Sequence, residues 1–158
     1  MTQPSVTIRP FRPDDLPACA ELFHQTVQQA TGAAYSAAQR QAWSPSIPDP
    51  AFWSKRLAGQ QIWVAQSAAG LQGFITLTDE GLIDFAFVHH AAVGRGVGKA
   101  LYAALLVGAR ARGLTRLTTE ASHIARPFFQ ALGFTVLCKN EVWLDGVMLE
   151  NFSMWTAI

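Results

Sequence analysis

Gly94-Arg95-Gly96-Val97-Gly98-Lys99 is the most informative stretch of the sequence. It follows a mostly apolar segment, residues 82–89, that has the composition of a buried strand, and it leads into an Ala- and Leu-rich segment, residues 97–111, with helical periodicity. Glycine has no Cβ atom, so the backbone here can approach a ligand closely and adopt positive φ angles. The first turn of a helix also presents unpaired N–H groups and a partial positive charge. The combination predicts a phosphate or pyrophosphate site, with Arg95 and Lys99 as candidate side-chain contacts.

Two common phosphate-binding motifs do not fit this loop. A Walker A loop requires GxxxxGK followed by Ser or Thr, but Val93 replaces the first glycine and Ala100 follows Lys99. A dinucleotide-binding fingerprint requires GxGxxG, whereas the glycines here alternate at positions 94, 96 and 98. Taken alone, the loop also allows a glycine-rich turn that binds no ligand.

The periodicity of the remaining sequence predicts helices and strands on both sides of the loop. Strands are expected at residues 5–9, 62–66, 71–78, 82–89, 116–121, 134–139, 141–144 and 150–156, and helices at residues 12–30, 36–43, 51–58, 97–111 and 124–132. Asp145-Gly146 is a hairpin turn signal. This order predicts one mixed-sheet α/β domain over residues 1–158, with about seven strands and four to five helices.

Composition excludes several classes of protein. Half of the 158 residues are hydrophobic and 15% are charged, so the chain folds, and a net charge of +1 gives no strong field for nucleic acid or an anionic membrane. Cys19 and Cys138 form no metal-ligand pattern, and neither a signal peptide nor a membrane span is expected. We therefore expect a soluble cytoplasmic protein without a metal, a nucleic-acid partner or membrane attachment.

Two segments together resemble the GNAT superfamily of N-acetyltransferases. Val88-His89-His90-Ala91-Ala92-Val93-Gly94-Arg95-Gly96-Val97-Gly98-Lys99-Ala100-Leu101 is similar to the family's Q/R-x-x-G-x-G/A segment, and Ala125-Arg126-Pro127-Phe128-Phe129-Gln130-Ala131-Leu132-Gly133-Phe134 is similar to its A-x-x-F-Y-x-x-x-G-F segment. The stretches 118–134 and 146–154 further resemble a bacterial, largely uncharacterised subgroup. The resemblance implies a GNAT-like fold, acetyl-CoA as co-substrate, and acetyl transfer to a primary amine of a small-molecule or protein acceptor. It also allows a homodimer.

The resemblance places acetyl-CoA along both segments. The implied cofactor-binding residues are Phe87, Val88, Val93, Gly94, Arg95, Gly96, Val97, Gly98, Lys99, Ser122, Arg126 and Phe129. Two of them depart from the family pattern, because Val93 replaces a Gln or Arg, and Phe129 replaces a Tyr that protonates the departing thiolate in many members. Phe129 therefore keeps open a non-catalytic acyl-CoA-binding or sensing module, and a small structural or interaction domain without CoA is a third reading.

Acetyl transfer to an amine requires a group that removes a proton and a donor for the thioester oxygen. Asp84 is a candidate base because it lies in an apolar strand, on the face expected to be opposite Phe85, where a carboxylate is costly unless it is paired or functional. Glu120 ends a strand, and His123 follows closely with a suitable pKa range. Each of these side chains also has an ordinary structural reading, as a paired charge, a solvated carboxylate or a surface residue. The oxygen donor is expected to be a backbone N–H near Phe87 or Val88.

The N-terminal third supplies the candidate acceptor surface. The resemblance implies that the first helices and the last strands wall this site. Tyr35, Trp43 and Trp53 are the candidate substrate-binding residues, and the alternative is that they belong to the core. If they line a cleft, the acceptor has an apolar or aromatic part.

Overall fold

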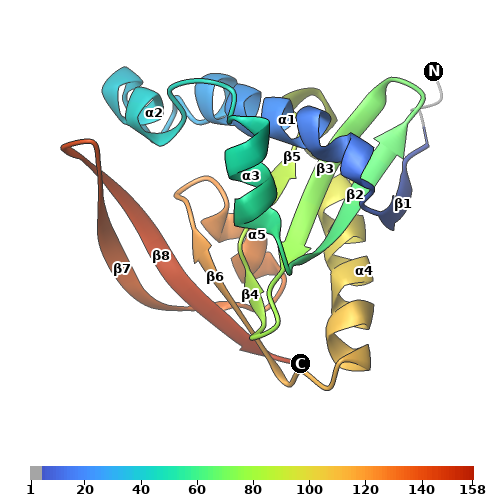
Figure 1. The fold of residues 1–158 in the computed structure, drawn as a ribbon. Helices are drawn as coiled ribbons and strands as arrows, with labels where there is room; N and C mark the ends of the chain where they lie inside the picture. The colour runs from blue at the N-terminus through green and yellow to red at the C-terminus, as the bar shows by residue number, and fades with distance from the viewer. Residues whose placement is uncertain (1–4) are drawn as a thin grey trace.

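The computed structural model describes residues 5–158, and over this range it contains eight strands and five α-helices with two short 3₁₀ turns (Figure 1). The helices are α1 (Leu16–Ala30), α2 (Ala37–Trp43), α3 (Pro50–Leu57), α4 (Val97–Ala111) and α5 (Arg126–Ala131). The strands are β1 (Thr7–Pro10), β2 (Gln61–Ser67), β3 (Gly70–Leu77), β4 (Leu82–Ile83), β5 (Ala86–Val88), β6 (Arg116–Ala121), β7 (Thr135–Leu144) and β8 (Val147–Ala157). The 3₁₀ turns are η1 (Pro13–Asp15) and η2 (His90–Ala92). The mixed α/β prediction is confirmed.

The strands form two four-stranded sheets that part from each other in the middle of the molecule (Figure 1). One sheet has the antiparallel order β1-β2-β3-β5, and the other has the order β4-β6-β8-β7. In the second sheet, β4 runs parallel to β6, and the other neighbours are antiparallel. Both sheets are therefore joined in sequence through the short connection between β4 and β5.

Side-chain alternation along β2 buries both faces of the first sheet. Trp63 and Ala65 belong to the core cluster that contains α4, whereas Ile62 and Val64 belong to the cluster that contains α1. Because successive side chains of a strand point to opposite faces, α4 and α1 cover opposite faces of this sheet (Figure 1). The sheet is thus a middle layer, and its last strand, β5, leads through η2 into the glycine loop.

The prediction of one continuous strand over residues 82–89 is wrong, because the chain breaks at Asp84 and Phe85. The break is stabilised by two buried hydroxyl groups, one from each sheet. The Phe85 N–H donates to Thr76 Oγ1 at 3.0 Å, and Thr119 Oγ1 donates to the Ile83 carbonyl at 3.0 Å. The Phe85 N–H and the Ile83 carbonyl therefore keep hydrogen-bond partners at the break.

The remaining element boundaries follow the sequence closely. α4 and β6 have the predicted bounds, and Ser36 caps α2 by accepting a hydrogen bond from the Gln39 N–H. The separate strands predicted at 134–139 and 141–144 are one strand, β7, which continues through Asn140 with a bulge near Leu137. The predicted Asp145-Gly146 turn is confirmed by positive φ angles at both residues.

Replacing Thr76 with Val should destabilise the protein by about 1–3 kcal/mol, because it removes the fully buried hydroxyl that accepts from the partly buried Phe85 N–H. Urea unfolding measures this change. Thr135→Val is a matched control, since Thr135 is an exposed strand residue. Equal stability of the two variants would show that the hydroxyl does not hold the break.

Candidate active site

Two cavities meet between the parted sheets. The larger, the loop cleft, has a volume of about 650 Å³ and lies between β5, the glycine loop and α5. The smaller, the side cavity, has a volume of about 370 Å³ and lies between α1–α3 and the β6–β8–β7 sheet. Six residues line both cavities: Trp43, Ala86, Phe87, Ser122, Ala125 and Phe129. A molecule in the loop cleft can therefore reach a molecule in the side cavity through this junction.

The structure brings most of the predicted cofactor-binding residues to the loop cleft. Its lining contains Phe87, Val88, Val93, Gly94, Gly96, Val97, Gly98, Lys99, Ser122 and Phe129. Gly94 and Gly96 both have φ +81, and a Cβ atom at either position would meet open space rather than protein. The loop thus needs glycine for its conformation and leaves room beside its backbone. Gly96 caps α4 without a side-chain hydrogen bond, so the first N–H groups of this 15-residue helix lack a side-chain cap.

The hydrogen-bond register gives β5 an open edge. The His89 N–H donates to the Gln72 carbonyl at 2.8 Å, and the Phe85 carbonyl accepts from the Thr76 N–H at 2.9 Å. In an antiparallel pair such bonded residues alternate with residues whose N–H and C=O groups point away. Ala86 and Val88 are the alternating residues, and within the described sheet β5 has no strand on that side. The register therefore turns the Val88 N–H toward this open side, and Val88 is also a lining residue of the loop cleft.

The junction is mostly apolar and contains one hydroxyl group. Phe129 is 1% exposed and its ring contacts Phe134, so this phenyl ring fills the junction without a polar atom. Ser122 Oγ accepts a hydrogen bond from the Ala125 N–H at 3.0 Å. Its own proton is therefore available to a group in the cavities.

Asp84 lies at the base of the side cavity in an ion pair. Its two oxygens accept hydrogen bonds from Arg56 at 3.0 and 3.2 Å, and Gln60 donates to it at 2.8 Å. The Arg56 guanidinium also lies over the Phe85 ring. Asp84 and Phe85 therefore face the same helix, α3, and the prediction that they occupy opposite faces is wrong because the strand breaks between them.

Glu120 lines the side cavity with one oxygen engaged. Its Oε2 accepts hydrogen bonds from Asn140 at 2.9 Å and Ser153 at 2.7 Å, whereas the network includes no bond to Oε1. Within residues 5–158, no Lys, Arg or His nitrogen lies within 4.0 Å of this carboxylate. Glu120 is thus an oriented, solvent-exposed carboxylate without an ion-pair partner among the described residues.

Tyr35 ties the N-terminal helices to the second sheet. Its hydroxyl donates to the Glu150 carbonyl at 2.8 Å and accepts from the His123 N–H at 2.9 Å. Burial raises the pKa of Tyr35, so the phenol stays neutral. A hydrogen bond from Lys139 lowers the pKa of the Glu150 side chain, which keeps that carboxylate charged and paired. Both hydrogen bonds of the Tyr35 hydroxyl are therefore structural, and they connect the N-terminal helices to the wall of the side cavity.

Four predicted site residues lie away from the linings of both cavities. Trp53 is 3% exposed and packs in the aromatic cluster under α1, and Arg126 lies over the Phe152 ring. The His123 ring packs against Tyr35 and Phe152, with Nε2 4.0 Å from the Glu150 carboxylate, and Arg95 is an exposed residue of the loop.

Sequence reasoning missed several residues of the side cavity. Arg56, Glu150 and Asn151 line it, and Asn140 orients Glu120. These residues come from α3 and from the β7–β8 hairpin, which lie far apart in the sequence, and no local motif marks them.

Within residues 5–158, no group of three or more His, Cys, Asp or Glu side chains could hold a metal ion. None of the described helices combines the length and apolar character needed to cross a membrane.

Comparison with known proteins identifies the family. Residues 29–154 match the model of the Acetyltransferase (GNAT) domain. An uncharacterised N-acetyltransferase of Escherichia coli K12, YafP, is 33% identical over 150 residues, which cover 95% of each chain. The peptidyl-lysine N-acetyltransferase YiaC of the same organism is 28% identical over 152 residues, with 96% of this chain and 97% of the relative covered. The crystal structure of a GCN5-related N-acetyltransferase from Rhodopseudomonas palustris is 35% identical, has a TM-score of 0.90 and covers 100% of this chain and 98% of its own.

The chain therefore belongs to the GNAT acetyltransferase family, as its two sequence segments predicted. Members of this family use acetyl-CoA as the acetyl donor, and the loop cleft is built from the segments that the resemblance assigned to that donor.

Proposed function

We propose that this protein transfers the acetyl group of acetyl-CoA to a primary amine that binds in the side cavity. The observation that carries the proposal is the junction, where the glycine-loop cleft and a cavity containing an unneutralised carboxylate share six residues. Acetyl-CoA supplies the acetyl group as an activated thioester. The protein's part is to hold the donor, polarise its carbonyl group, support the departing sulfur and receive the acceptor.

The glycine loop and the N-terminus of α4 suit the pyrophosphate of the donor. The N–H groups of the first helical turn and the helix dipole favour negative charge, and Gly94 and Gly96 leave space beside the backbone. Val93 lacks the polar side chain found in many relatives, but backbone groups make this kind of contact independently of side chains. Lys99 lines the cleft and adds a positive charge.

The Val88 N–H is the donor that we assign to the thioester oxygen. The His89 N–H donates to the Gln72 carbonyl of β3, and the alternation of the antiparallel register turns the Phe87 N–H to the same side, which leaves Val88 rather than Phe87 for this role. A fixed N–H group in an apolar cleft stabilises negative charge on the oxygen as the amine attacks.

Ser122 is the hydrogen-bond donor that we assign to the departing sulfur. Phe129 cannot donate a proton, but the Ser122 hydroxyl lies at the same junction and its oxygen is already occupied by the Ala125 N–H. When the C–S bond breaks, the electron pair goes to sulfur and the thiolate is stabilised by this hydroxyl, which keeps its own proton. A thiol pKa of about 8.5 makes departure as a thiolate feasible, and water protonates it afterwards.

Glu120 is the carboxylate that we assign to the acceptor amine. Its free oxygen and uncompensated charge favour an ammonium group, whereas the oxygens of Asp84 are occupied by Arg56 and Gln60. Glu120 accepts the proton that the ammonium loses, directly or through water, before the neutral amine attacks. The aromatic residues Trp43 and Phe87 line the cavity and suit an acceptor with an apolar part. A lysine side chain meets both requirements, and the relative YiaC is a peptidyl-lysine acetyltransferase.

Gly96→Asp should weaken acetyl-CoA binding by about tenfold or more, because the new carboxylate would meet the pyrophosphate. Calorimetry measures the affinity, and acetylation of a panel of amines and lysine peptides measures activity. Gly113→Asp is the matched control, because Gly113 has φ +77 and open space around it but lies at the other end of α4. If the Gly96 variant binds acetyl-CoA as tightly as the wild type, acetyl-CoA does not bind at the glycine loop. If the wild type binds acetyl-CoA but acetylates no amine, the protein is an acyl-CoA-binding module.

Ser122→Ala should reduce kcat by about 10- to 100-fold and raise the thiol pKa of enzyme-bound CoA, because a donor to the thiolate is lost. Ultraviolet absorbance of the thiolate across a pH series reports that pKa directly. Ser122→Thr keeps the hydroxyl and the cap on Ala125, so it should retain both properties. An unchanged bound-thiol pKa in the alanine variant would remove Ser122 from this role.

Glu120→Gln should lower kcat/KM for cationic amines by about 100-fold and leave acetyl-CoA affinity unchanged. Steady-state kinetics across pH, together with calorimetry, separate the two effects. Glu80→Gln, at an exposed turn, is the control for a lost surface charge. If Asp84→Asn abolishes turnover while Glu120→Gln does not, the acceptor carboxylate is Asp84.

A further inference from the structure

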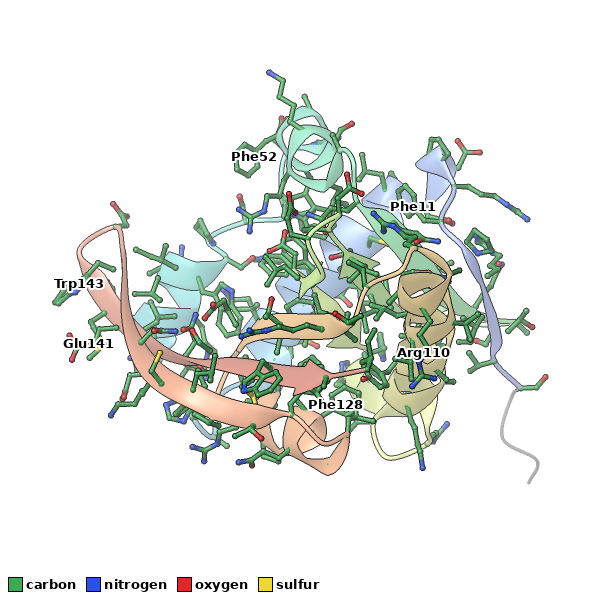
Figure 2. All side chains as sticks on the ribbon, turned by 90° about the horizontal axis from the view of Figure 1, so that it is seen from below. Phe11, Phe52, Arg110, Phe128, Glu141 and Trp143 are labelled. Carbon is green, nitrogen blue, oxygen red and sulfur yellow. The ribbon has the colours of Figure 1, made fainter. Side chains whose placement is uncertain are left out.

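Among the described residues, strand β7 pairs only with β8 and forms an open edge of the second sheet. The strand order β4-β6-β8-β7 places it last, and it runs for ten residues, Thr135 to Leu144, without a proline. Within the hairpin, β8 lies next to α2, where Gln39 donates to the Met148 carbonyl, and Figure 2 shows Glu141 and Trp143 on the outer side of the hairpin. Along such an edge every second residue presents free N–H and C=O groups to any strand that approaches.

The exposed side chains of β7 include two large apolar residues. Leu137 is 55% exposed and Trp143 is 65% exposed, and the side chains between them are polar or partly covered except for the exposed Cys138. Such residues at the two ends of one open edge favour a partner that covers both.

The sequence of β7 is complementary to itself when read in the opposite direction. With Asn140 as the centre, an antiparallel copy places Lys139 opposite Glu141 and Leu137 opposite Trp143. Cys138 falls opposite Val142. From residue 137 to residue 143, each position therefore meets a residue of matching character, and each pair except the central Asn140 pair occurs twice because of the twofold axis.

One charged residue of β7, Glu141, has no ion-pair partner within residues 5–158 of its own chain. Lys139 is bound to Glu150 at 2.7 Å, and it is the only Lys or Arg that forms an ion pair on this hairpin among the described residues. A second copy supplies its own Lys139 to the Glu141 carboxylate.

We propose that two copies of the chain associate through antiparallel pairing of their β7 strands about Asn140, which joins their second sheets into one. The bulge between Val136 and Cys138 confines regular pairing to residues 138–142, and it places Leu137 beside the partner's Trp143 at each end. The pairing also reaches the side cavity. Val142 lines that cavity, and residues opposite each other in adjacent strands share a face, so Cys138 of the second copy extends the cavity wall.

Charge reversal tests both the surface and the register. Lys139→Glu and Glu141→Lys each place like charges opposite each other at both symmetry-related positions, so each should weaken self-association by about tenfold or more. The double variant restores opposite charges at every pair and should associate like the wild type. A mixture of the two single variants should also associate, because every pair between the two different chains is then opposite in charge. Sedimentation velocity over a concentration series measures all four samples.

Arg110→Glu is the control, since Arg110 is exposed on α4, away from the hairpin (Figure 2). It should leave self-association unchanged. Circular dichroism and acetyl-CoA calorimetry show that each variant is folded. A wild-type protein that stays monomeric over the series overturns the proposal, and so do single variants that associate like the wild type. Single variants whose mixture stays monomeric overturn the register about Asn140.

Discussion

The break in the chain at Asp84 and Phe85 is the constraint on which the rest of the structure depends. A continuous strand over residues 82–88 would join both sheets into one layer and leave no space between them. Instead, β4 pairs with β6 and β5 pairs with β3, and buried hydroxyls from Thr76 and Thr119 satisfy the backbone at the break. The parted sheets create the two cavities, and the same break gives β5 the open edge at which the Val88 N–H faces the loop cleft.

The two cavities differ in how they handle charge. The loop cleft relies on backbone geometry, because glycines and a helix N-terminus do not depend on particular side chains there. The side cavity relies on side chains that neutralise one another in pairs, with Asp84 matched to Arg56 and Glu150 matched to Lys139. Glu120 is the exception among the cavity's described carboxylates, and its position is fixed by Asn140 and Ser153 rather than by a cation. A cavity with one unpaired carboxylate is suited to a positively charged ligand.

Local signals in the sequence predicted the loop cleft well and the side cavity poorly. The glycines at 94 and 96 and the start of α4 are contiguous, so their conformation follows from adjacent residues. The carboxylate of Glu120 and the amide of Asn140 are in contact only because β6, β8 and β7 are neighbours in the sheet. No local sequence pattern in these strands predicts that order. Strand alternation predicts Asp84 on the face opposite Phe85, but the break is stabilised by a hydrogen bond from Phe85 to Thr76, nine residues upstream, which has no local signature in the sequence. Trp53 shows the same limit, since an aromatic residue on a short helix has the same sequence pattern in a core as beside a ligand.

The hydroxyl of Tyr35 bears on the order in which the protein is assembled. Its bond to the Glu150 carbonyl joins residues 115 positions apart, whereas the loop cleft is formed largely by elements between β3 and α5. Contacts of long sequence separation form late in folding because loop closure must precede them. During synthesis, the hairpin that carries Glu150 emerges from the ribosome after the elements between β3 and α5, so the wall of the side cavity closes after the loop cleft has formed. A chain truncated before β7 would therefore keep the sequence of the glycine loop and lose the cavity beside it.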